Sequence, residues 1–338
     1  MGDVLRIGPL HGGGLVLGYR CPSRCRHCLY GAGPRRRDGA PPDEGALEAL
    51  LDELARRGPH ARYHIGGGEP FLDKTLLRRA IDGLRRRGLV LEYVETNASW
   101  VTSARQAEEI LDELAEVGLD CVLVSLSPFH AEFVPPRRTM TLIEAAQRVL
   151  RGGAFVWIAD FLPDIAGVEG SDRLDLEALL ESRGDSYARA LASRYGLVPG
   201  GRTGRYLHHH GLRRPWQELV DEAPCRRRLA DTSHFHVDGE GKYVPGLCAG
   251  IVLPLDAIPG EVDLSTRPIL AALVREGVGG LVELAGQRGF SPSETYSSAC
   301  DLCNHVRAFL FQAGYDHSED ELGPVGYYEQ FALEAYLR

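Results

Sequence analysis

Short apolar runs alternate with amphipathic stretches through the first half of the chain. Five of these runs have the length and composition of buried strands, and they span residues 15–19, 62–65, 89–95, 121–126 and 155–160. In the stretches between them, apolar residues recur with the spacing of one helical face. The chain therefore predicts successive βα units, which build a parallel sheet because βαβ crossovers are right-handed.

The stretch after the first run carries the clearest helical pattern. Its leucines occupy positions 47, 50, 51 and 54, which is the i, i+3, i+4, i+7 spacing. Asp43 is a candidate N-cap and Gly58 a stop signal. Further helices are expected at residues 77–84, 103–117 and 174–195, and Thr141 with Glu144 forms a capping box that would open another.

A short apolar segment at residues 197–198 is a candidate strand that would complete a sixth βα unit. Six units are too few to close an eight-stranded barrel. The predicted fold is therefore of the α/β class, a partial (βα)6 TIM-like barrel over residues 1–214.

The pattern changes after about residue 215. Residues 234–248 have the pattern of a β-hairpin with a glycine-containing turn, and helical segments follow. We predict a small second domain over residues 215–310 and a C-terminal helical segment over residues 311–338.

Composition narrows the class of protein. A hydrophobic content of 44% and a charged content of 25% are ordinary for a globular chain. The net charge of −9 argues against a nucleic-acid partner, and the arginines at 35–37 are interpreted as a solvated loop. Without a secretory signal pattern or an apolar run of about 18 residues, we expect a cytoplasmic protein that does not enter a membrane. There, its eight cysteines are expected to bind metal or take part in chemistry rather than form disulfides.

Three cysteines, Cys21, Cys25 and Cys28, follow the first predicted strand. A loop in that place lies at the C-terminal mouth of a barrel, where barrel enzymes keep their active sites. Three thiolates can hold three irons of a [4Fe–4S] cluster and leave the fourth iron open. A structural zinc site requires four protein ligands. We discount His27 as the fourth ligand because it is adjacent to Cys28, and adjacent residues seldom bind the same metal.

The loop after the second predicted strand has the sequence Gly66-Gly67-Gly68-Glu69-Pro70. Glycines let a ligand approach the backbone closely, and the carbonyls together with Glu69 could bind an ammonium group. Taken alone, the segment is better explained as a plain glycine-rich turn. Its position one βα unit after the cysteine loop favours a ligand site.

With C-x3-C-x2-C after the first strand and GGEP after the second, the chain resembles the radical S-adenosylmethionine (SAM) superfamily. The resemblance covers roughly the first 210 residues. It implies that SAM chelates the open iron through its amino and carboxylate groups. It further implies that an electron from the cluster cleaves SAM to a 5′-deoxyadenosyl radical, which removes a hydrogen atom from substrate. An external reductant such as flavodoxin or ferredoxin is then expected as a partner.

The resemblance also implies SAM contacts for particular residues. Gly67, Gly68 and Glu69 would hold the amino group, and His27 would lie near the adenine. For Ser125 and Ser127 the alternative is a hydrogen bond to the backbone, which serines at strand ends commonly form. The family also often has Asp where this chain has Ser127. The residues expected to contact SAM are His27, Gly66, Gly67, Gly68, Glu69, Asn97, Ser125 and Ser127.

Four more cysteines lie beyond the predicted barrel, at Cys225, Cys248, Cys300 and Cys303. A four-cysteine zinc ribbon is one interpretation, but a ribbon normally supplies two C-x2-C pairs and only one is present. Their order and spacing resemble the twitch domain, a shortened SPASM domain found in enzymes such as 2-deoxy-scyllo-inosamine dehydrogenase. The resemblance implies a second, auxiliary [4Fe–4S] cluster with no open coordination position, which suits electron transfer. The eighth cysteine, Cys121, is interpreted as a buried core thiol.

Hydrogen-atom removal followed by transfer of a second electron to the auxiliary cluster is a net two-electron oxidation. We expect such a reaction on a small molecule or a peptide side chain. Two alternatives stay open: a peptide-modifying enzyme that forms thioethers or epimerises residues, with a cysteine as hydrogen-atom donor in the second case, and a non-enzymatic zinc or electron-transfer protein. The candidates for facing the substrate, each of which a surface position would also explain, are His130, Asp160, Arg202, Arg205 and Tyr206.

Overall fold

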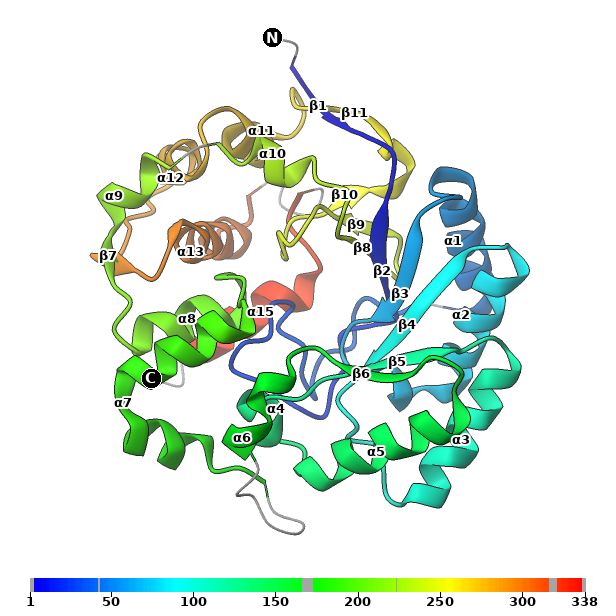
Figure 1. Ribbon diagram of the computed structural model, residues 1–338. Helices are drawn as coiled ribbons and strands as arrows, with labels where there is room; N and C mark the ends of the chain where they lie inside the picture. Colours follow the sequence, from blue (N-terminus) through cyan, green and yellow to red (C-terminus); the bar gives the residue numbers. More distant parts are fainter. Residues whose placement is uncertain (1–2, 42, 166–172, 223, 316–320, 336–338) are drawn as a thin grey trace.

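A curved, mainly parallel sheet of eight strands forms the centre of the structure (Figure 1). The structure is a computed structural model, and it describes residues 3–41, 43–165, 173–222, 224–315 and 321–335. The strands of the sheet, in chain order, are β2 (Gly12–Val16), β3 (Arg62–Gly66), β4 (Val90–Thr96), β5 (Cys121–Val124), β6 (Gly153–Val156), β8 (Phe235–Asp238), β9 (Lys242–Val244) and β10 (Leu253–Pro254). They lie side by side in the order β10-β9-β8-β2-β3-β4-β5-β6.

Six neighbouring strands, from β8 through β2 to β6, run parallel, and β9 and β10 add an antiparallel edge. The outer face of the sheet is covered by α1 (Glu44–Arg57), α2 (Lys74–Arg86), α3 (Ala104–Glu116) and α5 (Pro136–Val149) (Figure 1). Crossover helices on one face of a curved parallel sheet are the architecture of a partial TIM-like barrel, so the predicted fold class is confirmed.

The helix predicted from the leucine spacing is confirmed in its residues and its ends. Asp43 caps α1 by accepting a hydrogen bond from the backbone N–H of Ala46, and Gly58 follows its last residue. The four leucines of α1 are buried against the sheet, and burying each contributes roughly 1.5–3 kcal/mol. The spacing of the leucines was sufficient to predict α1, because this helix packs a single apolar face against the sheet.

The sixth parallel strand is not where the sequence predicted it. Residues 197–198 lie in a loop after α7 (Leu176–Tyr195), and the sixth strand is β8, which pairs with β2. An uncovered edge of β2 would leave backbone donors and acceptors unpaired, and β8 supplies their partners. The sheet therefore continues across the predicted boundary at residue 214.

Three predicted element ends also move. β2 ends at Val16 and β6 at Val156, so residues 17–19 and 157–158 belong to loops at the mouth of the barrel, and residues 159–160 lie in a short 3-10 helix. Helix α5 begins at Pro136 rather than at Thr141, because Pro fits the first turn of a helix, where its missing N–H is not needed.

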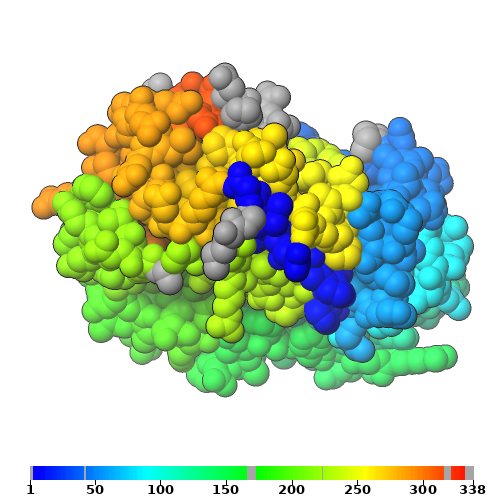
Figure 2. Space-filling view, turned by 90° about the horizontal axis from the view of Figure 1, so that it is seen from above, coloured from blue at the N-terminus to red at the C-terminus, as the bar shows by residue number. Residues whose placement is uncertain are grey.

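The predicted hairpin at residues 234–248 is confirmed as the antiparallel pair β8 and β9. Strand β1 (Val4–Ile7), which the pattern did not predict, crosses the surface to pair with β11 (Gly260–Asp263), as Figure 2 shows. The remaining elements are α4 (Pro128–Ala131), α6 (Leu162–Ile165), α8 (Arg202–His209), β7 (Arg214–Pro215), α9 (Trp216–Val220), α10 (Arg226–Leu229), α11 (Pro268–Arg275), α12 (Val278–Gly286), β12 (Thr295–Tyr296), α13 (Ala299–Gln312), α15 (Val325–Ala335) and the short 3-10 helices η1 (Pro70–Leu72), η2 (Ala159–Phe161) and η3 (Leu255–Ala257).

One apolar core joins the barrel to the C-terminal third of the chain. Leu15 of β2, Phe235 of β8 and Leu302 of α13 belong to the same buried cluster. Helix α13 crosses the predicted boundary at residue 310, and residues 316–320 and 336–338 of the predicted C-terminal segment lie outside the described residues. Within the described part of the chain, no helix is both long and apolar enough to cross a bilayer.

Candidate active site

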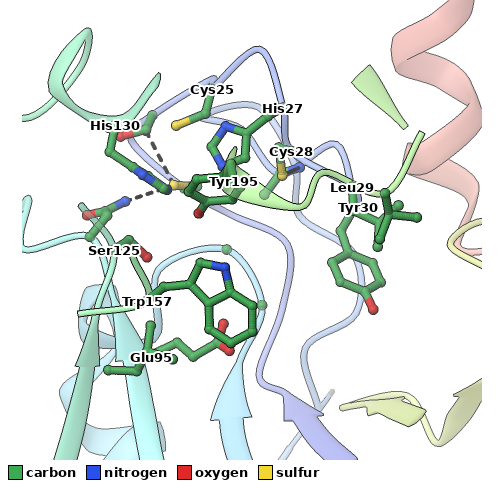
Figure 3. A pocket seen from close by; sticks show the side chains of 18 of the residues that line it. Cys25, His27, Cys28, Leu29, Tyr30, Glu95, Ser125, His130, Trp157 and Tyr195 are labelled. Atoms are coloured by element: carbon green, nitrogen blue, oxygen red, sulfur yellow. Dashed lines mark hydrogen bonds between the residues drawn. The ribbon is translucent and has the colours of Figure 1, made fainter. Parts of the chain in front are cut away.

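A cavity of about 460 Å³ opens where the parallel strands end (Figure 3). The loops that follow β2 to β6 line it, as expected for the C-terminal mouth of a barrel. Figure 3 shows Cys25, His27 and Cys28 on one side of the cavity and Glu95 with Trp157 on the other. The predicted site residues that the structure brings together on its wall are Cys21, Cys25, His27, Cys28, Gly67, Gly68, Asn97, Ser125, His130 and Arg202.

The cysteine loop is held in place by buried cations. Arg202 donates from Nε to the carbonyl oxygen of Cys25 (2.9 Å) and from Nη2 to that of Ala32 (2.8 Å). Arg36, which is 7% exposed, pairs with Asp38 and donates to the carbonyl oxygen of Tyr30. Arg202 therefore anchors the loop although it was a candidate for facing the substrate, and Arg36 is not the solvated residue that the sequence predicted.

Two of the three thiols accept hydrogen bonds that favour their thiolate form. The sulfur of Cys21 accepts from the backbone N–H of Ser23 (3.4 Å) and the side chain of Asn97 (3.3 Å), and that of Cys28 accepts from the backbone N–H of Ala32 (3.3 Å). Burial opposes ionisation, since it raises the pKa of Cys21 to about 12 and that of Cys25 well above its usual value. A bound cationic centre removes that cost, because a coordinating thiol is deprotonated.

The separation of the sulfur atoms fits a cluster better than a single zinc ion. Sulfurs on one zinc lie at most about 4.6 Å apart, since each Zn–S bond is about 2.3 Å. Within the described residues, the one set of three ligand atoms that all lie within 4.8 Å of one another comes from histidines and not from cysteines. Three thiols spread around a loop can instead each reach a different iron.

The glycine loop after β3 packs directly on the cysteine loop. The backbone N–H of Gly68 donates to the carbonyl oxygen of Gly18 (2.8 Å), and that of Glu69 donates to the carbonyl oxygen of Arg20 (2.9 Å). A Cβ on Gly68 would lie 2.0 Å from the Arg20 oxygen, and Gly67 has a φ of +126°. The glycines are therefore required by the contact between the two loops, a reason that the sequence analysis did not foresee.

Glu69 is buried and does not line the cavity. Its carboxylate is 3% exposed and accepts from the hydroxyl of Thr96 (2.9 Å) and the backbone N–H of Asn97 (2.8 Å). Burial raises the pKa of Glu69 to about 7. In the structure this side chain positions the strand end that carries Asn97. Gly66 does not line the cavity either, and the predicted contacts of both residues with SAM stay predictions.

Replacement of Gly68 by Ala is expected to disturb the cysteine loop. The added methyl group meets backbone atoms that cannot rotate away, so the backbone must shift, at a cost of about 1–3 kcal/mol. Iron content after reconstitution and the free energy of unfolding in denaturant should both fall. Gly33→Ala is the matched control, because a Cβ on this loop residue meets nothing within 4 Å. Wild-type iron content in Gly68→Ala would contradict this account.

His27 stands within an aromatic group at the side of the cavity. Its ring centroid lies 4.7 Å from that of Phe129, 4.6 Å from that of Tyr195 and 4.8 Å from that of His130. Burial holds the pKa of His27 well below its usual value, so its ring is neutral. Its Nδ1 atom is buried and has no hydrogen-bond partner. An apolar wall with one free polar atom fits a planar heteroaromatic group such as adenine.

The two serines of the fourth barrel unit have different surroundings. Ser125 lines the cavity, where it can contact a ligand. Ser127 is 0% exposed, and its hydroxyl bonds Nδ1 of His130 at 2.9 Å. Ser127 thus orients His130, a cavity residue whose pKa burial lowers to about 4.

The structure does not bring the other predicted substrate residues to this cavity. Asp160 is exposed in η2, beyond the end of β6. Tyr206 is buried and donates its hydroxyl to the carbonyl oxygen of Ala188 (3.2 Å). Arg205 lies over the ring of Phe331 beside another cavity. Cys121, at the far end of β5, is half-buried rather than buried.

Sequence reasoning missed several residues of the cavity wall. They are Tyr30, Tyr93, Glu95, Trp157, Tyr195 and His234. Tyr93 and Glu95 are two positions apart on β4, so they point to the same face. The sequence did offer a signal for these two residues, because polar side chains on one face of a predicted buried strand indicate a polar cavity at that face. Burial raises the pKa of Glu95 to about 7.

A second cavity, of about 1020 Å³, is lined by the four cysteines beyond the predicted barrel, Cys225, Cys248, Cys300 and Cys303. They come from different elements: Cys225 precedes α10, Cys248 follows β9, and the last two lie on α13. The two cavities share Leu29, Val198 and Leu247 in their walls, so they adjoin.

A partial parallel barrel with a cysteine-lined cavity at the C-terminal ends of its strands has the architecture of a barrel enzyme. Residues 15–158 match the family model of the Radical SAM superfamily. This part of the chain is therefore similar to radical SAM proteins. The similarity favours an enzyme over the non-enzymatic alternatives.

Several solved structures match the chain at low identity. BtrN in complex with AdoMet and 2-DOIA is 16% identical with a TM-score of 0.32, and the match covers 44% of this chain and 57% of that chain. SuiB from Streptococcus suis, bound to S-adenosylmethionine, is 15% identical with a TM-score of 0.38, over 84% of this chain and 67% of that chain. Coproporphyrinogen III oxidase from Escherichia coli is 11% identical with a TM-score of 0.34, over 91% of each chain. No curated protein matches the chain.

Proposed function

We propose that this enzyme oxidises a small molecule by two electrons, with an auxiliary [4Fe–4S] cluster as the acceptor of the second electron. Cys21, Cys25 and Cys28 would hold the cluster that binds SAM, and residues 215–310 would form a twitch-like region around the auxiliary cluster. When bound, SAM and its cluster supply the radical that takes a hydrogen atom from a substrate C–H bond. The substrate then loses one electron and one proton. An external reductant such as flavodoxin or ferredoxin would supply the electron that starts each turnover.

The adjoining cysteine-lined cavities carry this proposal. Four cysteines from three parts of the chain face one cavity, and four thiolates complete the coordination of a [4Fe–4S] cluster. That cavity shares wall residues with the cavity lined by Cys21, Cys25 and Cys28. A substrate in the first cavity is therefore next to the site of the proposed electron acceptor.

The charges around the second cavity favour an acceptor. Arg228 donates from Nη1 to the sulfur of Cys300 (2.9 Å). Arg307 is 4% exposed, and its Nε has no hydrogen-bond partner, which leaves a buried donor beside the cavity that Cys303 lines. Positive charge and hydrogen bonds to cluster sulfurs raise the reduction potential of an iron–sulfur cluster. The two arginines thus favour a centre that takes an electron from the substrate radical.

The position of the thiols argues against epimerisation. A thiol that donates a hydrogen atom must face the substrate, and in the described part of the chain the cysteines on the wall of the first cavity are Cys21, Cys25 and Cys28. Those three belong to the proposed SAM cluster. The four cysteines of the second cavity do not line the first.

The size of the first cavity favours a small substrate over a peptide. Pockets for drug-sized ligands have volumes of about 300–1,000 Å³. SAM alone would take much of the 460 Å³ available, so the remaining space suits a molecule of few atoms. Glu95, Ser125 and His234 line the wall and suit a substrate with hydroxyl or amino groups.

Mass spectrometry of the products tests this proposal. Reduced, reconstituted enzyme with SAM should convert a member of a panel of amino sugars and aminocyclitols to a product lacking two hydrogens. One 5′-deoxyadenosine should form per product, and deuterium at the oxidised carbon should appear in it. Short peptides bearing serine, cysteine or lysine form the comparison panel. Turnover confined to peptides, or a product of unchanged mass and inverted configuration, would refute the proposal.

A further inference from the structure

Three histidine side chains meet inside the barrel, apart from both sets of cysteines. His64 lies on β3 and His236 on β8, and His234 is the residue directly before β8. One ring nitrogen of each lies within 4.8 Å of the other two. Of the described residues, no other set of three metal-binding side chains meets this condition. The cluster joins β3 and β8, which are remote in the chain and flank β2 in the sheet (Figure 1).

The register of the sheet creates a space between two of these rings. Gly14 of β2 is the pairing partner of His64 on one side and of His236 on the other. A Cβ on Gly14 would lie 2.5 Å from Nε2 of His64 and 2.9 Å from Nε2 of His236. Because Gly14 has no side chain, both Nε2 atoms border a space that an ion could occupy.

The hydrogen bonds leave these nitrogens available. Nε2 of His64 is buried and has no hydrogen-bond partner, and Oε1 of Glu95, at 3.7 Å, is beyond hydrogen-bond distance. His236 bonds the hydroxyl of Tyr30 through Nδ1 at 2.7 Å. Histidines that bind metal commonly use their other ring nitrogen in such a bond, which fixes the tautomer and the orientation of the ring.

We propose that His64, His234 and His236 bind one divalent transition-metal ion of the zinc type, at the inner end of the active-site cavity. Imidazole nitrogens suit such ions, and bonds of about 2.0–2.1 Å in a tetrahedral arrangement place two nitrogens on one ion about 3.3–3.4 Å apart. Since the ring nitrogens lie within 4.8 Å of one another, the rings need to close by at most about 1.5 Å, which side-chain rotations allow. The nearby Glu95 carboxylate adds negative charge that favours a cation.

The site would face the substrate through His234, which lines the cavity together with Glu95. Three protein ligands leave a position for a further ligand, as in catalytic zinc sites. A hydroxyl or carboxylate oxygen of the substrate fits that position. The ion would then orient the substrate, a role that goes beyond the proposed oxidation and uses none of the cysteines.

Zinc content and zinc X-ray absorption test the proposal on the reconstituted protein, whose cysteines already hold iron. After incubation with zinc and removal of the excess, wild type should retain about one zinc per chain with nitrogen neighbours at about 2.0–2.1 Å. His64→Ala and His236→Ala should lose it. Tyr30→Phe should weaken zinc binding at least about tenfold, since it removes the partner of His236. Sulfur neighbours at about 2.3 Å would place the zinc on cysteines and overturn the proposal.

Two further variants keep the test valid if the buried positions do not tolerate change. His234→Ala alters the least buried of the three rings and should also lose the zinc, whereas His60→Ala changes an exposed histidine outside the cluster and should keep it. Equal zinc retention in wild type, His64→Ala and His234→Ala would overturn the site. Iron content and SAM cleavage are measured in the same samples, so a failure of the proposed oxidation is distinguished from a failure of zinc binding.

Discussion

Alanine at Cys21, Cys25 and Cys28 together is expected to abolish SAM cleavage and to remove about half of the iron. Two [4Fe–4S] clusters bring about eight irons per chain, and the triple variant should retain about four. The remaining cluster would have four protein ligands and no open iron, so it could not chelate SAM. Among the described residues, the cavity lining contains no other cysteine, so no neighbouring side chain can replace the three thiolate ligands of the cluster irons.

The measurements are iron and sulfide per chain after anaerobic reconstitution, and 5′-deoxyadenosine formed with dithionite and SAM. Cys121→Ala is the matched control, since this thiol lies at the far end of β5 and outside both cavities. It should keep about eight irons and full SAM cleavage. Measurable SAM cleavage by the triple variant, or zinc in place of iron in the wild type, would contradict the assignment.

Alanine at any one of Cys225, Cys248, Cys300 and Cys303 is expected to stop product formation while 5′-deoxyadenosine still forms. Each thiol would be one of four ligands of the auxiliary cluster, so the loss of any one damages the same centre. The SAM cluster uses separate ligands and should remain. Loss of the auxiliary cluster should also lower stability, because metal binding couples to folding.

The four single variants are compared for iron content, 5′-deoxyadenosine yield and oxidised product, each with the true substrate once it is known. Similar losses of about four irons in all four would support electron transfer through one cluster. Arg228→Met removes the cation beside Cys300 without removing a ligand, so it should keep the iron and slow the oxidation. A cysteine variant with full iron, continued hydrogen abstraction and no product would instead identify a hydrogen-atom donor and favour epimerisation.

Much of the barrel was predictable because its helices and strands are specified by residues that lie close together in the chain. The apolar spacing of α1 and its two end residues, and the lengths of the runs around β3, β4 and β5, each depend on residues close in the chain. The cysteine spacing was equally informative, since three ligands on one short loop must lie near one another. Strand order at the edge of the sheet was not predictable, because β2 and β8 are far apart in sequence.

The amino-acid sequence by itself determined the class of chemistry: three thiols on one loop, a glycine loop one βα unit later, and four further cysteines. Only the tertiary structure decided what these residues touch. Gly68 is glycine because the backbone of Arg20 lies against it, and Arg202 supports the cysteine loop. His64 and His236 meet across Gly14 because β3 and β8 flank β2. Such contacts depend on which strands pair, and pairing is fixed by burial and backbone hydrogen bonding across the whole sheet rather than by any local pattern.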